Sequence, residues 1–267
     1  MDKTEIVFLK LGGSLITNKF RPHTAKRKVI LRLADEIKEA LSQNEKLRVV
    51  LGHGSGSFGH IPAKKFNTRM GVSTKEEWAG FLNVWQEARA LNIIVTDSML
   101  EAGLPVISLP VSAFVVTQNG IPGEIQFPTL ERAVQAGLIP ILFGDTVFDS
   151  ARGGAILSTE EIFSLAIPFL HPSRVLVAGV EPGVWADYPK NQTIVDKITS
   201  RTYTSIKDQV LGSAAVDVTG GMFSKVEILL KMVQDFPDME CTIFSGVQPG
   251  NITKALLNKK LGTTIRS

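Results

Sequence analysis

Three times along this chain, a short run of apolar residues leads directly into a turn that contains glycine. The runs are residues 6–9, 47–51 and 139–143, and the glycines that follow them are Gly12, Gly52 and Gly144. Runs of this length are typical of strands that are buried on both faces of a parallel sheet. Because ligands of such sheets bind beyond the carboxyl ends of the strands, we expect the three glycine turns to open on one edge.

Segments with the spacing of amphipathic helices separate the apolar runs. Helices are expected over residues 30–41, 73–103 (as one helix or two), 129–136, 160–169, 222–235 and 251–258, and further strands over 105–109, 175–178 and 242–244. Residues 111–126 are expected to form an irregular hairpin. This alternation predicts an α/β fold with a mostly parallel open sheet covered on both faces, as a single domain over residues 1–267.

Composition narrows the class of protein. The 267 residues include 44% hydrophobic residues and carry a net charge of +3, as expected for a soluble globular protein. No charge-free apolar run has transmembrane length and no signal peptide is visible, which favours a cytoplasmic protein with no membrane partner. Lys26, Arg27 and Lys28 are expected to form the wet face of a helix, with no nucleic-acid partner. The single Cys241 excludes an internal disulfide and is expected to be a buried thiol.

The first glycine turn lies between two lysines, Lys10 and Lys19. The backbone N–H groups of a turn such as Gly12-Gly13-Ser14 can face an anion without interference from side chains, and lysine supplies a point charge for a phosphoryl group. Lys10 follows four apolar residues, where a lysine is rarely buried without a partner. The turn therefore predicts a phosphate site.

Two more glycine-rich segments lie downstream. Residues 52–60 contain a G-x-G-x-x-G match, and residues 217–225 place Gly221 at the start of a helix with Lys225 one turn further on. The match alone is a weak dinucleotide signal, because Pro62 follows it closely and no clear acidic ribose ligand comes after a second strand. Together the three segments favour phosphoryl transfer, with a dinucleotide-dependent oxidoreductase as an alternative. The other loop histidines, His23, His53 and His171, are expected to be solvated.

These motifs resemble those of the amino acid kinase superfamily, and within it the isopentenyl phosphate kinase family. The pieces that carry the resemblance, in order, are residues 10–14 with Lys19, residues 54–60, Gly144 with Asp145, and residues 217–222 with Lys225. The histidine of the second piece marks the branch that holds isopentenyl phosphate and fosfomycin kinases. The resemblance implies a three-layer αβα sandwich, ATP with Mg²⁺ and a homodimer. It also implies an acceptor-binding lobe over about residues 1–150 and a nucleotide-binding lobe over about 151–267.

The resemblance also implies a role for each matching position. The implied catalytic residues are Lys10, Lys19, His60 and Asp145, with Lys19 following the transferred group and Asp145 orienting the lysines or lying near the metal. The implied nucleotide ligands are Gly12, Gly13, Ser14, Gly56, Gly221 and Lys225. The implied acceptor ligands are Ser55, Gly59, His60 and Gly144, with Phe81, Trp85 and Ile94 beside an apolar tail. No protein ligand is assigned to the metal.

The residues also support this chemistry without the resemblance. A phosphate monoester is mostly a dianion at neutral pH, so as an acceptor it needs no general base, and the protein must instead bring two anions together. The donors and charges for this task are Lys10, Lys19, Lys225 and His60. Residues 157–161 and 178–184 depart from the family pattern near the expected nucleotide site, which leaves base preference open; Ser158 and Glu161 form a plausible capping box. A kinase for another small phosphate or phosphonate, such as fosfomycin, and a non-catalytic sensor of the same fold remain alternatives.

Overall fold

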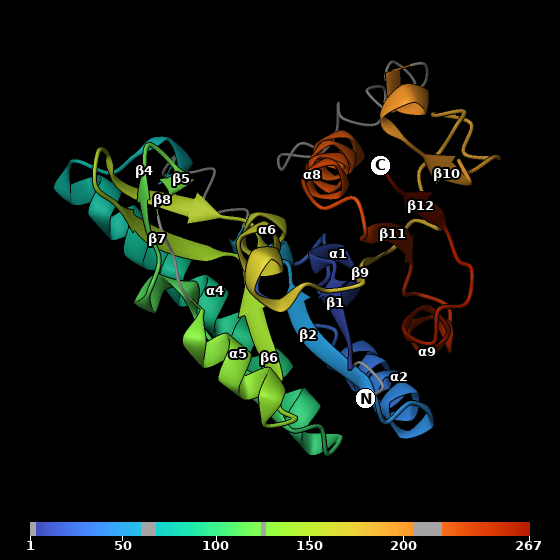
Figure 1. Ribbon diagram of the computed structural model, residues 1–267. Helices are drawn as coiled ribbons and strands as arrows, with labels where there is room; N and C mark the ends of the chain where they lie inside the picture. Colours follow the sequence, from blue (N-terminus) through green and yellow to red (C-terminus); the bar gives the residue numbers. More distant parts are fainter. Residues whose placement is uncertain (1–3, 60–67, 124–126, 205–220) are drawn as a thin grey trace.

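One sheet of eight strands runs through the molecule (Figure 1). The computed structural model describes residues 4–59, 68–123, 127–204 and 221–267. In their order across the sheet, the strands are β10 (Lys197–Ile198), β12 (Thr263–Ile265), β11 (Glu240–Ser245), β9 (Arg174–Gly179), β1 (Glu5–Leu11), β2 (Leu47–His53), β6 (Ile139–Phe143) and β3 (Val106–Ser108). All neighbours are parallel except β11 and β12. The mostly parallel sheet expected from the sequence is confirmed.

Helices cover both faces of this sheet. One face packs against α1 (Gly13–Ile16), α2 (Arg27–Gln43), α4 (Lys75–Glu101) and α9 (Asn251–Leu256), and the other against α5 (Pro128–Gln135), α6 (Thr159–Leu170) and α8 (Gly221–Asp235). Alternate residues of β1 point into two hydrophobic cores, one on each face of the sheet. Phe8 belongs to the core under α6 and α8, whereas Val7 and Leu9 belong to the core under α2 and α4. The result is a three-layer αβα sandwich.

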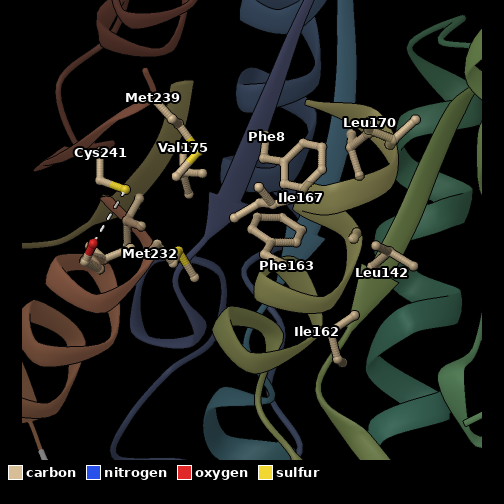
Figure 2. Packing of buried hydrophobic residues seen from close by; sticks show 14 of the residues in the cluster. Phe8, Leu142, Ile162, Phe163, Ile167, Leu170, Val175, Met232, Met239 and Cys241 are labelled. Atoms are coloured by element: carbon tan, nitrogen blue, oxygen red, sulfur yellow. Dashed lines mark hydrogen bonds between the residues drawn. The ribbon is translucent and has the colours of Figure 1, made fainter. Parts of the chain in front are cut away.

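The core under α6 and α8 is drawn in Figure 2. The ring of Phe8 lies against Phe163 of α6, with 4.9 Å between the ring centroids. Cys241 of β11 is fully buried beside Met232, and its thiol donates a weak hydrogen bond to the carbonyl oxygen of Leu229 at 3.9 Å. Burial raises the pKa of this thiol, so Cys241 is the inert core residue that the sequence predicts.

A second, smaller sheet extends from the end of β6 (Figure 1). Its strands, in order, are β5 (Ile121–Pro122), β4 (Val116–Gln118), β7 (Asp145–Asp149) and β8 (Gly153–Leu157), with the short 3₁₀ turns η1 (Thr68–Met70) and η2 (Val111–Ala113) nearby. β4 and β5 are the described part of the hairpin expected over residues 111–126. The sequence did not predict β7 and β8, of which β7 begins and ends with aspartate and β8 begins with two glycines.

Each of the other expected helices and strands is present, with shifts of a few residues at the ends. Residues 75–101 form one helix, and its start has a capping box between Thr74 and Glu77. The predicted capping box of Ser158 and Glu161 starts α6. Within the described ranges, no helix has both the length and the apolar character needed to span a bilayer.

Candidate active site at the carboxyl edge of the sheet

The chain changes direction across the sheet at β1, which lies between β2 and β9. The strands on the β2 side come from before residue 144 of the chain, and those on the β9 side come from after residue 173. Such a switch point leaves a crevice beyond the carboxyl ends of the strands, where ligands of open α/β sheets bind. Leu11, His53 and Phe143 end β1, β2 and β6 in register at this edge, as the spacing of the glycine turns predicts.

The start of α6 is tied to two of these strand ends through one hydroxyl. Gly144 donates its backbone N–H to Oγ1 of Thr159 at 3.1 Å, and Oγ1 of Thr159 donates to the carbonyl oxygen of His53 at 2.7 Å. Thr159 is buried. The first turn of α6 is therefore held directly at the edge where the glycine turns open.

The first two glycine turns touch each other through their backbones. Gly54 donates to the carbonyl oxygen of Leu11 at 3.0 Å, and a Cβ on Gly54 would lie 2.9 Å from the amide nitrogen of Gly13. A Cβ on Gly13 would overlap the backbone of Gly56. Gly56 itself has φ +50 and faces Thr17 too closely for any side chain. Only glycine fits at these positions, which explains the pattern in the sequence.

Four backbone N–H groups at these turns remain available to a ligand. In the part of the chain that the structure describes, no hydrogen bond uses the amides of Gly13, Ser14, Ser55 or Gly56. By contrast, the neighbouring Gly12 amide donates to the carbonyl oxygen of Ala178 at 2.8 Å, which anchors the turn to the end of β9. Amides of this kind, with glycine on both sides of a narrow gap, suit an anion such as a phosphate.

Lys10 is buried at this edge and has a carboxylate partner. The alternation along β1 places its side chain on the same side as Phe8, where α6 lies, and there it forms an ion pair with Glu160. Lys10 is 7% exposed and Glu160 is 5% exposed. This confirms that a lysine at this strand end requires a partner.

A second lysine acts on the same carboxylate. Burial by itself would raise the pKa of Glu160, but the charge and hydrogen bond of Lys10, with a smaller contribution from Lys225, lower it below the ordinary value. Lys225 comes from the first turns of α8. The structure therefore brings Lys10, Glu160 and Lys225 together from β1, α6 and α8, with one more positive than negative charge.

Asp145 lies nearby but has a different environment. It is the first residue of β7 and is buried, and its Oδ1 accepts a hydrogen bond from the Thr146 amide at 2.8 Å. Burial raises the pKa of Asp145 to about 6, against the opposing hydrogen bonds from Ser112 and Thr146. Its Oδ2 has no hydrogen-bond partner among the described residues. The carboxylate that pairs with Lys10 is Glu160, which was not predicted as a site residue.

Lys19 is not part of this buried cluster. A bridge between Thr17 and Ala25 closes a short hairpin, and Lys19 lies exposed in the turn at its far end. The hairpin is fastened to α4 by His23, whose Nδ1 lies 2.6 Å from Oε2 of Glu87. Within the described ranges, no ion pair or hydrogen bond joins Lys19 to the glycine turns.

The acceptor side of the site is described in part. Ser55 and Gly59 lie close together, since a Cβ on Gly59 would be 2.6 Å from Cβ of Ser55. His60 and residues 217–220 lie outside the described residues. Gly221 is the first residue of α8, as the sequence predicts.

Aromatic side chains of α4 face the small sheet. The ring of Phe81 lies 5.2 Å from Trp78 and 5.6 Å from Phe148 of β7, measured between centroids. Trp85, one turn further along, is half-buried and has the guanidinium of Arg89 5.9 Å from its ring. Ile94 packs on the core under α2 and α4, on the opposite side of the helix axis from Trp85. Phe81 and Trp85 thus share a face that Ile94 does not.

The structure places two further residues at this edge differently from what the sequence predicts. His53 is 1% exposed and hydrogen-bonded to Asn92, so the expectation of a solvated side chain is wrong. Lys26 donates from Nζ to the carbonyl oxygen of Ser14 at 3.0 Å and is half-buried, whereas Arg27 is exposed as expected. The position of each residue in the sequence could have indicated its burial. His53 ends a buried strand, and Lys26 precedes a helix that begins beside the first turn.

In the described ranges, no three His, Cys, Asp or Glu side chains gather in a way that would hold a metal ion. Mg²⁺ is commonly held by one or two carboxylates together with substrate phosphates, so such a cluster is not required for it. Glu160 and the unpartnered Oδ2 of Asp145 are the kind of oxygen ligand it prefers.

Comparisons with known proteins agree with this geometry. The sequence profile of the amino acid kinase family matches residues 5–245. Isopentenyl phosphate kinase of Methanocaldococcus jannaschii is 31% identical over 273 residues, which cover 97% of this chain and 98% of the relative. A crystal structure of isopentenyl phosphate kinase superposes with a TM-score of 0.81 at 27% identity, over 98% of this chain and 100% of that chain. UMP kinase from Ureaplasma parvum, 15% identical over the whole of both chains, has a TM-score of 0.67 and shares the fold alone.

Proposed function

The chain belongs to the amino acid kinase family, and from that premise we propose that it transfers the γ-phosphoryl group of ATP to isopentenyl phosphate. The products are isopentenyl diphosphate and ADP. The observation that carries this proposal is the cluster of Lys10, Glu160 and Lys225 beside two glycine turns with unused amides. The similarity to isopentenyl phosphate kinases over nearly the whole chain supports the choice of acceptor.

Charge is the main requirement of this reaction. The transition state of phosphoryl transfer is loose, so the protein mostly positions the reactants and neutralises charge on the transferred group. Lys10 and the turn of Gly12, Gly13 and Ser14 hold the β- and γ-phosphates. Lys225 and the amide of Gly56 bind the nucleotide from the other side. Glu160 holds the buried Lys10 in place, so that this lysine needs no reorganisation when phosphates arrive.

Lys19 follows the transferred group. Its exposed position on the hairpin of residues 17–25 lets the side chain reach toward the phosphates when the site fills. The fixed base of that hairpin limits the movement to the turn. Lys19→Ala is therefore expected to lower kcat more than it raises KM for ATP.

The acceptor binds on the side of the second glycine turn. Ser55, Gly59, Gly144 and His60 contact its phosphate, and His60 acts as a hydrogen-bond donor. No general base is required, because the acceptor is already mostly a dianion. Asp145 lies beside Gly144 and orients the polar groups of this subsite or accepts a contact from magnesium-bound water.

The apolar tail of the acceptor lies between α4 and the small sheet. β7 runs away from Asp145, and Phe148 is three residues along it, roughly 10 Å at the rise of a strand. Phe81 and Phe148 already form an aromatic wall at that distance. A short branched hydrocarbon can contact this wall, and Trp85, on the same face of α4 as Phe81, is a more distant candidate, whereas Ile94 faces the opposite core.

ATP with Mg²⁺ is the proposed cofactor. When bound, the ion would neutralise part of the charge of the phosphates. We also propose that residues 1 to about 150 bind the acceptor and residues from about 151 bind the nucleotide, in a cytoplasmic homodimer. The division of the sheet at β1 between strands from the two halves of the chain supports these two lobes.

An acceptor comparison tests the proposal. ADP release is followed with ATP, Mg²⁺ and either isopentenyl phosphate, fosfomycin or no acceptor, with Lys10→Met as the inactive control. The proposal predicts release with isopentenyl phosphate alone. ADP release with fosfomycin, at a rate that does not depend on an apolar tail, would favour a phosphonate kinase instead. No ADP release with any acceptor, while ATP still binds, would favour a sensor.

A further inference from the structure

One buried histidine at the site has no part in the phosphate chemistry described above. His53 is the last residue of β2 and directly precedes Gly54. Its imidazole is 1% exposed and stacks on Phe143 at the end of β6, with 5.4 Å between the centroids and 2° between the planes. The ring therefore lies among the strand ends from which the second glycine turn and Gly144 emerge.

Hydrogen bonds join this residue to three other elements. Nε2–H of His53 donates to Oδ1 of Asn92 on α4 at 3.2 Å, and Nδ2 of Asn92 donates to Oγ of Ser108 on β3 at 2.7 Å. The backbone carbonyl of His53 accepts from Thr159 on α6. Asn92 is 6% exposed. A single chain of polar groups thus connects the glycine turn with the middle of α4.

The imidazole is neutral in this environment. Burial lowers the pKa of His53 to about 4, against the hydrogen bonds to Asn92 and Gly54, and the charge of Lys10 lowers it further. A neutral ring adds no charge beside Lys10 and attracts no phosphate by charge. Its role is consequently one of geometry.

Buried polar groups of this kind require hydrogen-bond partners. An apolar side chain of similar size would fill the same space without needing partners, whereas a buried amide or imidazole costs free energy unless it is hydrogen-bonded. When every member is satisfied, such a network fixes one arrangement of the elements that it joins. Here those elements are the turn at Gly54 and the helix that carries Phe81.

We propose that His53, Asn92 and Ser108 are positioning residues for the acceptor, an inference that rests on the proposed function. They fix the amide of Ser55 relative to α4, so that the phosphate and the apolar tail of one acceptor molecule meet their subsites at the correct spacing. A displacement of reacting groups by about 1 Å can lower a rate by about a hundredfold. Loss of the network should therefore affect the acceptor far more than ATP, whose ligand Lys10 is anchored separately by Glu160.

Steady-state kinetics on folded variants tests this inference. His53→Phe keeps the ring stack on Phe143 and removes the hydrogen bonds, and Asn92→Leu breaks the same bond from α4. Each is expected to lower kcat/KM for isopentenyl phosphate by about tenfold or more, with KM for ATP changed by less than about threefold. The double variant should be no worse than the worse single variant, because both remove one interaction. His53→Gln, which restores a donor, should recover part of the loss.

Ser98→Ala is the matched control, since Ser98 is also buried on α4 but donates only to the carbonyl oxygen of Ile94 in its own helix. A second measurement uses the unaltered chain: ¹⁵N spectra should show the His53 ring neutral at pH 6 with its proton on Nε2. A ring that is charged at pH 6, equal losses for ATP and acceptor, or additive losses in the double variant would each overturn the inference. If the wild type does not use isopentenyl phosphate, both the proposed function and this inference are wrong. If the wild type is active and the variants have unchanged kinetics, only this inference is wrong.

Discussion

The buried pair of Lys10 and Glu160 is the residue-scale feature on which the site depends. Removing one partner of a buried ion pair leaves an uncompensated charge and commonly destabilises a protein by roughly 3–5 kcal/mol. Glu160→Gln leaves the buried Lys10 without its counter-charge. Because a bound phosphate replaces that charge, pyrophosphate should raise the melting temperature of the variant more than that of the wild type.

Differential scanning fluorimetry with and without pyrophosphate measures both effects. Glu161→Gln is the control, because it alters the cap of the same helix without touching Lys10. It should cost only about 1 kcal/mol and leave the pyrophosphate response unchanged. An identical response in Glu160→Gln and wild type would remove Glu160 from the phosphate site.

Asp145 predicts a pH dependence of stability. Burial raises its pKa to about 6 from an ordinary value of 3.8, so between these values the folded protein binds a proton that the unfolded chain does not. The contribution of this carboxyl to stability therefore falls as the pH rises from about 4 to about 6, by up to roughly 3 kcal/mol. Urea unfolding at pH 4.5 and 7.5 should show that Asp145→Asn is less unfavourable, or even stabilising, at the higher pH. A difference from wild type that is the same at both pH values would mean that Asp145 is solvated.

The pairing of Lys10 shows what residue-level sequence reasoning can achieve. The position of Lys10 after an apolar run predicts burial and hence a partner, and the structure confirms both. The identity of the partner was missed, because Glu160 lies 150 positions away and no local pattern links the two. His53 was misread for the same reason, since its partner Asn92 is on a different element.

At the scale of elements, the small sheet is held by one carboxylate in its turns. Buried Asp149 accepts hydrogen bonds from Oγ1 of Thr117 and from the amides of Asn119, Gly120, Ala151 and Arg152. Although burial opposes ionisation, these bonds lower the pKa of Asp149 well below its usual range. The carboxylate therefore joins the turn after β4 to the turn between β7 and β8.

Asp149→Asn should loosen the small sheet without unfolding the large one. Amide hydrogen exchange measured by mass spectrometry is expected to speed up in residues 116–123 and 145–157, while β1 and β9 keep their protection. Asp187→Asn is the comparison, because Asp187 also accepts turn amides, from Gln192 and Thr193, but at an exposed site. Uniformly faster exchange in both sheets would show that they unfold as one unit.

α4 and the small sheet should also set the length of the acceptor tail. Phe81→Ala opens space beside Phe148 and should shift kcat/KM toward longer prenyl phosphates. Gly154→Ala works in the opposite sense, because its Cβ would lie 2.8 Å from the Phe81 ring and should disfavour even the short tail. An unchanged ranking of geranyl and isopentenyl phosphate in both variants would make Phe81 a plain core residue.

The elements differ in how far the sequence predicts them. Strands buried on both faces and long amphipathic helices have local patterns, and they were predicted to within a few residues. β7 and β8 were missed because neither has an apolar run of that kind: β7 begins and ends with aspartate, and β8 begins with two glycines. The capping box of α6 was predicted, since it depends only on residues three apart.

At the scale of the whole molecule, the order of the strands explains why the site lies where it does. β1 is flanked by β2 and β9, so its carboxyl end is where turns from both halves of the chain meet. The glycine turns predicted this common edge from sequence, because parallel strands end together. The pairing of β1 with β9 could not be predicted, since it joins residues more than 160 positions apart.

The central claim is that this edge transfers a phosphoryl group from ATP onto a phosphate. Phosphorus NMR of the protein with ATP, Mg²⁺ and isopentenyl phosphate tests it most directly, because the product contains a new phosphorus–phosphorus coupling. The account predicts that the acceptor singlet is replaced by the two doublets of a diphosphate in step with the appearance of ADP, and that Lys10→Met abolishes both. ADP formed while the acceptor singlet stays intact would contradict it, since water or another group would then be the acceptor.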